Sequence, residues 1–411
     1  MNIAYFSDQY WPSISGVSVS VDAFKKHLCL MGHRVILFVP DYPDADGYDQ
    51  IEDAQDVHRF QSHAIAFNDE NRLVCRSEKR KIFALLDHLK PEIIHVHTEF
   101  ALGNIATSYA KKRRIKLVMT AHTNWENIVE HYVPVIPAGI AHLCCRLYMQ
   151  YVYNKADMLV VPTSLMELLL GLYFVKTPIR VIPTGIDTCV FTGAGQHNSA
   201  LQFDAYHVLE GKRFLFFAGR LGKEKNIPFL IDVFARLAPQ YKDLMLVICG
   251  DGPAKSDLQA YAKSSGCADS ILFPGYIERK RLHHFYRRAE VFVFASKVES
   301  QGMVVLEAMA CGTPVVAIGK MGTREVMGGD TGGFMVDDDI FDFTEKVQLL
   351  LSSPALHKAK AEGARRHAES WTMEVQAEKM LKLYRRLLEG QSAQLPEFPQ
   401  KNRSETSPVE L

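Results

Sequence analysis

The sequence predicts an α/β protein built from two doubly wound, mainly parallel β-sheets. Short, continuous apolar runs recur along the chain, as expected for strands that are buried on both faces of a sheet. Segments with helical periodicity lie between these runs, so strands and helices alternate in each half of the sequence. A length of 411 residues is enough for two domains, each with a core of its own.

The first half opens with a strand, a helix and a second strand. In the helical segment, apolar side chains recur on one face at Val17, Val21, Phe24 and Leu28, and Gly32 can end the helix. This β-α-β unit is the repeat from which doubly wound sheets are built. The strands of this half are expected at residues 2–7, 34–39, 93–97, 116–120, 158–162 and 180–183.

The second half repeats the pattern after a polar segment at 193–204 that is rich in turn-forming residues, so we place a linker at 185–210. Its strands are expected at residues 213–219, 244–250, 270–275, 291–296 and 313–318. The expected division is an N-terminal domain over 1–190, a C-terminal domain over 191–370, a helix over 371–390 and a disordered tail over 391–411. Because parallel sheets bind ligands beyond the carboxyl ends of their strands, a cleft between two facing sheets is the expected site.

The composition argues against several classes of protein. The chain carries 47 Lys and Arg against 47 Asp and Glu, so we expect no nucleic-acid partner. The longest apolar stretch, residues 165–175, contains Glu167 and is shorter than the roughly 18 residues that span a bilayer. The N-terminus does not resemble an export signal, and the 8 cysteines include no Cys-x-x-Cys pair. We therefore expect a cytoplasmic protein with reduced thiols that does not cross a membrane.

The segment 291–317 runs from a strand through a short loop into a helix. Glu299 belongs to the loop, Gly302 lies near the helix start, and Glu307 lies about a turn and a half inside the helix. A helix N-terminus attracts anions, so a phosphate group could lie between the two carboxylates. Sugar hydroxyls would suit Glu299 and ribose hydroxyls would suit Glu307. The alternative is structural: Glu307 caps or pairs, and Glu299 is only solvated.

A second segment, 214–226, leaves a buried strand through Gly219 into a turn that carries Arg220 and Lys225. Two fixed cations at the carboxyl end of a strand suit a diphosphate leaving group, because negative charge grows on it as a glycosyl bond breaks. An ordinary solvated turn is the alternative.

Together these segments resemble the nucleotide-sugar glycosyltransferases of family four, retaining enzymes with the GT-B fold, in which two Rossmann-like domains face each other across a cleft. Glu299 and Glu307 match the family signature of two Glu separated by seven residues, and Arg220 and Lys225 match its Arg followed five positions later by Lys. The resemblance covers roughly residues 1–390. It implies catalytic roles for Arg220, Lys225 and Glu299. The implied donor-binding residues are Glu307, Gly302, Met303 and Val304.

The first half adds further matches to this family. Residues 10–20 resemble the glycine loop whose backbone approaches the donor phosphates, with Ser15 before Gly16 where the family often has a second glycine. His122, at a strand end, resembles the family histidine that contacts the donor hexose, which implies a catalytic role; a structural histidine is the alternative. Thr184 lies where the family's hinge segment often carries Asn.

We expect no metal and no cofactor, since the nucleotide-sugar is a substrate. Asp337, Asp338 and Asp339 match the Asp-x-Asp motif of metal-dependent glycosyltransferases, but they lie in an acidic loop far in sequence from the two glutamates. His95 and His97 are expected to face opposite sides of their strand, which would prevent them from binding one metal together.

Within the family, three details resemble the bacterial diacylglycerol glucosyltransferases: SISGV at 13–17, HVHTEFALG at 95–103 and Ser-Gln-Gly after Glu299. Two basic clusters agree with a lipid acceptor. One has the spacing of a single helical face, at Arg72, Arg76, Lys79 and Arg80, and the other is KKRRIK at 111–116. Such clusters suit an anionic membrane surface, so we expect peripheral docking at the inner face of the cell membrane. An ordinary solvated helix is the alternative.

The resemblance thus implies a retaining, metal-independent hexosyltransferase that moves glucose from UDP-glucose to a membrane lipid, diacylglycerol. A soluble small-molecule or sugar acceptor is the main alternative. A sugar-nucleotide epimerase of the same architecture and a non-catalytic sugar-binding protein are the others.

Overall fold

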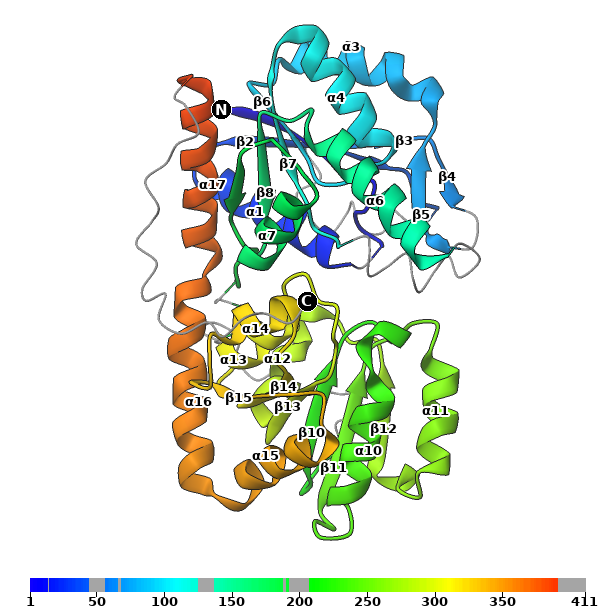
Figure 1. Cartoon of the computed structure of the whole chain (residues 1–411), viewed down its shortest axis with the longest axis vertical. Helices are drawn as coiled ribbons and strands as arrows, with labels where there is room; N and C mark the ends of the chain where they lie inside the picture. Colours follow the sequence, from blue (N-terminus) through cyan, green and yellow to red (C-terminus); the bar gives the residue numbers. More distant parts are fainter. Residues whose placement is uncertain are drawn as a thin grey trace.

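The computed structural model describes residues 1–13, 15–43, 56–65, 68–124, 137–187, 190–191 and 207–390. The predicted tail at 391–411 and most of the predicted linker therefore lie outside the described residues. Two parallel sheets form the two halves of the molecule, which Figure 1 shows one above the other. The first sheet has the order β3-β2-β1-β6-β7-β8-β9 and the second β12-β11-β10-β13-β14-β15.

The first sheet contains every strand expected in this half, with ends that differ by one or two residues. These strands are β1 (Asn2–Phe6), β2 (Arg34–Pro40), β6 (Ile93–Val96), β7 (Lys116–Thr120), β8 (Met158–Val161) and β9 (Ile179–Val181). The edge strand β3 (Val57–Phe60) was not predicted. Its sequence, VHRF, is only partly buried and lacks the apolar run that marks a central strand.

Helices cover both faces of the first sheet. One face packs against α1 (Gly16–Leu30) and α17 (Met373–Leu388). The other packs against α3 (Lys79–Leu89), α4 (Ala101–Arg113), α6 (Ala138–Tyr153) and α7 (Ser164–Leu172). The predicted apolar face of α1 is buried as expected, with Val21 and Leu28 fully inaccessible to solvent.

The second half has the same doubly wound arrangement. Its strands are β10 (Arg213–Ala218), β11 (Leu244–Cys249), β12 (Ile271–Gly275), β13 (Val291–Phe294), β14 (Val315–Ile318) and β15 (Gly333–Val336). Its helices are α10 (Ile227–Leu237), α11 (Lys255–Ser264), α12 (Arg279–Arg288), α13 (Met303–Ala310), α14 (Met321–Met327), α15 (Ile340–Ser352) and α16 (Pro354–Ala368). The edge strand β15 was not predicted, because glycine opens its short apolar run.

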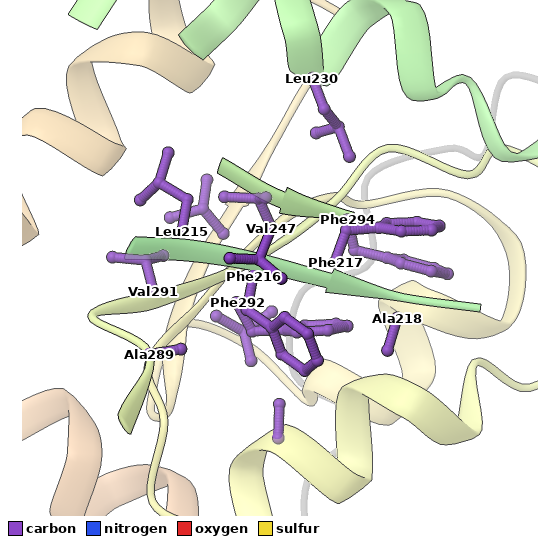
Figure 2. Packing of buried hydrophobic residues seen from close by; sticks show 14 of the residues in the cluster. Leu215, Phe216, Phe217, Ala218, Leu230, Val247, Ala289, Val291, Phe292 and Phe294 are labelled. Carbon is purple, nitrogen blue, oxygen red and sulfur yellow. The ribbon is translucent and has the colours of Figure 1, made fainter. Parts of the chain in front are cut away.

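Aromatic side chains on neighbouring strands build the core of this half. Phe216 of β10 and Phe292 of β13 are register partners, and their rings lie 6.1 Å apart on one side of the sheet. Phe217 and Phe294 stack on the other side, as Figure 2 shows. Side chains that alternate between two buried faces explain why these strands are continuously apolar.

The last described helix returns to the first half of the molecule. Helix α16 packs on the second half, whereas α17 buries Met373, Ala377 and Tyr384 against the first sheet, and Figure 1 shows α17 along the side of that half. Where the chain crosses, the backbone N–H of Ile186 donates to Trp371 and that of Met373 donates to Ile186. A Cβ at Gly185 would lie 2.6 Å from the Thr372 carbonyl oxygen, so only glycine allows this close approach. The two crossing segments thus run side by side.

The carboxyl ends of strands from both sheets meet between the halves. Thr163, which follows β8, donates from its Oγ1 to the Ser300 carbonyl at 3.2 Å, and Ser300 follows β13. The backbone N–H of Ser164 donates to a carboxylate oxygen of Glu325 at 2.7 Å. The edges that were expected to carry the site therefore face one another.

The prediction of a single basic helix over residues 72–81 is wrong. Arg72 lies in strand β5 (Asn68–Val74), which pairs with β4 (Ser62–Ile65), and its Nε donates to Ser62 Oγ at 2.8 Å. Arg76 lies in a 3-10 turn, Arg76–Glu78, and α3 begins only at Lys79. Antiparallel pairing with the preceding strand β4 supplies residues 68–74 with hydrogen bonds, which outweighs local helical spacing. Three of the four predicted cations, Arg76, Lys79 and Arg80, nevertheless line a surface pocket of about 760 Å³ together with Lys112 and Arg113 of α4.

Candidate active site

The two predicted cations lie at the carboxyl end of β10, as expected. Arg220 follows the strand directly, and Lys225 ends a 3-10 turn, Lys223–Lys225. The Lys225 ammonium donates a hydrogen bond to Glu299 Oε1, and only 19% and 16% of the two side chains are exposed. The structure therefore brings Lys225 and Glu299 into direct contact, although they are far apart in sequence. Arg220 Nη1 lies 3.9 Å from Glu224 Oε1 in the same turn.

Backbone contacts hold this cationic turn in place. The Leu221 N–H donates to the Asp251 carbonyl at 2.8 Å, and the Gly219 N–H donates to Cys249 at 3.1 Å. Gly250 has φ +139°, and a Cβ there would lie 1.8 Å from the Gly219 carbonyl oxygen. Glycine at position 250 thus lets the GDGP turn, 250–253, pack directly against the segment that carries Arg220.

Glu307 is buried in α13, with 4% of its surface exposed, and both carboxylate oxygens have protein partners. Arg279 donates to Oε1 at 2.8 Å, and the Tyr286 hydroxyl donates to Oε2 at 3.1 Å. This agrees with the alternative in which Glu307 pairs, and it fixes the orientation of the carboxylate. Arg279 and Tyr286, both on α12, were missed by the sequence analysis because nothing in their own segment marks them as partners of Glu307.

Gly302, Met303 and Val304 lie at the start of α13, where they were expected. Gly302 has φ +84°, which suits glycine, and it takes the N-cap position. Within the described part of the chain, no side chain caps this helix. The first N–H groups of α13 are therefore available to an anion.

Gly16 opens helix α1 at the carboxyl end of β1. Ser15 caps the helix, since its Oγ accepts from the Ser18 N–H at 3.1 Å and its own N–H donates to Ser18 Oγ at 2.8 Å. The cap explains the serine found where the family often has a second glycine. A Cβ added at Gly16 would meet no atom of the described residues within 4 Å.

His122 follows β7 and belongs to a cluster of histidines. His97 Nδ1 lies 3.1 Å from His122 Nε2, and the rings of His95 and His97 stack with centroids 4.2 Å apart. The expectation that His95 and His97 face opposite sides is wrong, because residues two apart on a strand share a face. Burial lowers the pKa of His122 to about 4, so its imidazole is neutral at physiological pH.

The histidine cluster is connected to helix α17. The Tyr384 hydroxyl lies 2.6 Å from His95 Nδ1 and 2.9 Å from the Tyr5 hydroxyl. His95 Nε2 is in turn 2.7 Å from Thr120 Oγ1. The C-terminal helix therefore helps to fix the imidazoles beside the candidate site, a role that the periodicity of α17 did not indicate.

Two further carboxylates lie at the carboxyl end of the first sheet. Asp8, which is 2% exposed, accepts hydrogen bonds from Thr98 Oγ1 at 2.8 Å and from the Leu102 N–H at 3.1 Å. Burial raises the pKa of Asp8 to about 7, with a smaller contribution from nearby Glu99. Glu99 accepts from the Tyr153 hydroxyl of α6. Asp8 was not singled out from the sequence, although its position just after the first strand could have marked it.

Gln301 joins the two halves at the base of the site. Its Oε1 accepts from the Thr184 N–H at 2.9 Å, and its Nε2 donates to the Thr184 carbonyl at 2.6 Å. The Thr184 hydroxyl lies 2.7 Å from Ser20 Oγ of α1. The glutamine of the Ser-Gln-Gly segment thus holds the backbone of the hinge segment, and the Thr184 hydroxyl has a polar partner although threonine replaces the usual Asn.

Two of the three acidic residues that were discounted as metal ligands have structural partners. Asp339 caps α15, accepting from the N–H groups of Phe341 and Asp342, and Asp338 pairs with Lys297. Among the described residues, no group of three His, Cys, Asp or Glu has the geometry of a metal site. In the same part of the chain, no helix is long and apolar enough to span a bilayer.

Comparison with known proteins agrees with this architecture. Residues 14–189 match the model of Glycosyltransferase Family 4, and residues 200–367 match that of Glycosyl transferases group 1. The chain is 32% identical to the alpha-monoglucosyldiacylglycerol synthase of Streptococcus pneumoniae, over 78% of this chain and 71% of that protein. It is 28% identical to the protein of the same name from Acholeplasma laidlawii, over 77% and 80%. Other relatives include a GDP-mannose-dependent alpha-mannosyltransferase and D-inositol 3-phosphate glycosyltransferases.

Solved structures share the fold at lower identity. Sucrose-phosphate synthase from Thermosynechococcus elongatus superimposes with a TM-score of 0.74 at 21% identity, covering 95% of this chain and 99% of that one. HepE of Anabaena in complex with UDP gives 0.72 at 15% identity, covering 93% and 99%.

Two facing doubly wound sheets, with cations and carboxylates at their opposed edges, define a glycosyltransferase of the GT-B fold, and the predicted fold class is confirmed. The chain belongs to glycosyltransferase family 4.

Proposed function

We propose that this glycosyltransferase transfers glucose from UDP-glucose to diacylglycerol in a membrane, with retention of configuration. The observation that carries the donor half of the proposal is the contact between Lys225 and Glu299 beside Arg220, at the carboxyl end of β10. The acceptor half is supported by two relatives named alpha-monoglucosyldiacylglycerol synthase, which match most of the chain.

The site suggests how the donor would be activated. In the free protein the Lys225 ammonium is held by Glu299. When a diphosphate binds, its oxygens can take over Lys225, which leaves the Glu299 carboxylate able to accept hydrogen bonds from hexose hydroxyls. Arg220 and Lys225 would then stabilise the charge that grows on the departing diphosphate.

Retention requires the acceptor hydroxyl to attack the anomeric carbon on the face from which the diphosphate leaves. The bond from that carbon to the diphosphate oxygen breaks, the bond to the acceptor oxygen forms, and the acceptor proton passes to the departing phosphate. His122 would contact the hexose as a neutral hydrogen-bonding group, because burial disfavours its charged form. None of these steps uses a metal, so we propose that the enzyme needs neither a metal nor a cofactor.

The surface pocket of about 760 Å³ between α3 and α4 is the proposed contact with anionic lipid. It is lined by Arg76, Lys79, Arg80, Lys112 and Arg113, with Asp87 the one acidic residue in its lining. Cations near a negatively charged leaflet contribute about 1 kcal/mol each. A diacylglycerol hydroxyl lies at the bilayer surface, and we propose that the enzyme reaches it by docking on the inner face of the cell membrane.

A water-soluble acceptor is the competing proposal, and the relatives named D-inositol 3-phosphate glycosyltransferase favour it. The experiment that separates the two offers the purified enzyme a panel of radiolabelled UDP- and GDP-sugars with diacylglycerol in vesicles and with soluble acceptors. We expect transfer from UDP-glucose to diacylglycerol, an α-linked product by NMR, and unchanged activity in EDTA. Transfer only to a soluble acceptor would reject the lipid, and activity that EDTA abolishes and a divalent ion restores would reject the metal-free mechanism.

A further inference from the structure

Helix α6 exposes a row of large apolar side chains. Ile140, Leu143, Leu147 and Tyr151 are spaced three or four residues apart, so they lie on one side of the helix. They are 57%, 56%, 56% and 65% exposed. We refer to these four residues as the α6 stripe. Isolated exposed apolar residues are common, but four on one helical face form a continuous apolar surface that usually marks an interface.

The end of α7 extends this surface. Gln150 of α6 donates from its Nε2 to the Phe174 carbonyl at 3.2 Å, so Phe174 lies beside the stripe. The Phe174 side chain is 74% exposed and its φ is +58°, a backbone conformation that favours glycine and disfavours bulky residues. A large, exposed aromatic side chain at such a position adds little to the core, so Phe174 enlarges the apolar surface that α6 presents to solvent.

The helix that carries the stripe is firmly packed on its other side. Met149, Val152 and Tyr153 are almost completely buried against the first sheet. The Tyr153 hydroxyl donates to the Glu99 carboxylate, and the Tyr148 hydroxyl donates to the Glu99 carbonyl at 2.9 Å. The stripe therefore belongs to a rigid element, and its exposure does not come from a loosely attached helix.

Charge at the edge of the stripe identifies its partner. The sequence of α6 contains no Asp or Glu. Lys155 Nζ lies 3.5 Å from the centroid of the Tyr151 ring, and the Arg146 guanidinium lies 5.2 Å from that of Tyr173. Apolar side chains bordered by tyrosines and by cations with long apolar stems match the interface of an anionic bilayer.

The stripe and the basic pocket also lie in one layer of the molecule. Helices α3, α4, α6 and α7 all pack on the same face of the first sheet. A membrane that attracted the cations of α3 and α4 could thus meet the apolar residues of α6 and α7. Because α6 holds Glu99, which follows β6, the same contact would bring the bilayer beside the carboxyl end of the sheet.

We propose that the α6 stripe, continued by Phe174, inserts into the surface of an anionic bilayer and places the enzyme where its acceptor is embedded. The role assigned to this docking rests on the proposed lipid acceptor, but docking itself is tested separately, by vesicle binding. It assigns the apolar part of membrane docking to α6 and α7, next to the electrostatic part contributed by α3 and α4.

The test compares the double variant Leu143→Ser, Leu147→Ser with Leu30→Ser in sedimentation with phosphatidylcholine vesicles that contain phosphatidylglycerol. Leu30 is a matched control, since it is 75% exposed on α1, on the opposite face of the sheet. The affinity of the double variant for these vesicles should fall by roughly tenfold or more. The reason is that two apolar side chains, which would otherwise move from water into the bilayer, have been removed. Leu30→Ser should bind like the wild type. Unchanged thermal unfolding of all variants shows that the fold is intact.

Two further measurements make the outcome decisive. In the first, brominated phospholipid should quench the fluorescence of a Leu147→Trp variant. In the second, the variant Leu143→Ser, Leu147→Ser should lose activity on diacylglycerol in vesicles but keep its activity on a short-chain diacylglycerol dispersed in detergent. Vesicle binding that the double variant retains in full would overturn the proposal. So would a wild-type dimer that the same substitutions dissociate, since the stripe would then contact a second copy. If wild type binds vesicles without glycosylating diacylglycerol, the proposed function fails and the docking surface stands.

Discussion

At the scale of single residues, the site is organised by ion pairs that a substrate has to rearrange. Lys225 is paired with Glu299, and Glu307 is paired with Arg279. Arg220 Nη1 lies 3.9 Å from Glu224 Oε1 in the turn that also carries Lys225.

Arg220→Ala should therefore lower turnover strongly. Removing one preorganised donor to a developing negative charge costs about 2.7–4 kcal/mol, or roughly 10²–10³ in rate. Steady-state kinetics with UDP-glucose measure the effect, and Lys223→Ala in the same turn is the control, because Lys223 is exposed and lies in the same 3-10 turn as Lys225. Wild-type turnover in Arg220→Ala would show that this guanidinium does not act on the leaving group.

The two glutamates should have separable effects. Glu299→Gln should reduce turnover without weakening UDP binding, because Glu299 is expected to hold the hexose and its charge now holds Lys225 in the free protein. Glu307→Gln should weaken UDP binding, measured by calorimetry, and should also lower the thermal midpoint, because it leaves Arg279 without its carboxylate partner. If Glu307→Gln leaves UDP affinity unchanged, Glu307 does not bind the donor and has only the structural role that its contacts with Arg279 and Tyr286 indicate.

At the scale of elements, the start of α4 is tied to the loop after β1 by one buried carboxyl group. Asp8 accepts from the Leu102 N–H in the first turn of α4, and burial raises its pKa from 3.8 to about 7. The folded state therefore holds this proton more tightly than the unfolded state. Its contribution to stability is fully present below about pH 4 and is lost as the pH rises through about 7.

Asp8→Asn should consequently gain stability relative to the wild type between about pH 4 and 7, by up to about 1.4 kcal/mol per pH unit, and the difference should level off above that range. Thermal midpoints of both proteins across this range measure it. Asp257→Asn, at an exposed position on α11, is the control. A difference between Asp8→Asn and wild type that does not change with pH would mean that folding does not raise the pKa of Asp8.

Most elements were predictable because their signals are local. The central strands are continuous apolar runs, and the position of Gly302 at the start of α13 followed from the chain around it. The errors arose where contacts outside the segment itself, or a weak apolar pattern within it, decide the structure. Arg72 joins a strand because it pairs with residues 62–65, and β3 escapes notice because an edge strand need not be apolar. Arg279 and Tyr384 contact Glu307 and His95 only after the chain has folded, so their own segments give no sign of these roles.

At the scale of the whole molecule, docking on a membrane would depend on the basic pocket between α3 and α4. The net charge is zero, yet this does not oppose docking, because charges act only within a Debye length of about 8–10 Å at physiological salt. What matters is the local surface, and the pocket gathers Arg76, Lys79, Arg80, Lys112 and Arg113 around one acidic residue, Asp87. Arg113 pairs with Asp87 at 2.6 Å, which leaves the pocket with a clear positive excess.

We therefore expect vesicle binding and activity on diacylglycerol to rise with the content of anionic lipid and to fall with salt. The variant Arg76→Glu, Arg80→Glu should weaken both vesicle binding and activity on diacylglycerol, since it reverses two exposed charges. Each cation near an anionic leaflet contributes about 1 kcal/mol to the free energy of binding. UDP affinity should not change, because neither residue lies at the carboxyl edge of the second sheet. Arg72→Glu tests the correction made by the structure: Arg72 bonds to Ser62 within the β4–β5 pair and does not line the pocket, so its reversal should reduce lipid binding less than reversal of Arg80. Equal losses for Arg72 and Arg80, or binding that is insensitive to salt, would contradict a docking surface centred on α3 and α4.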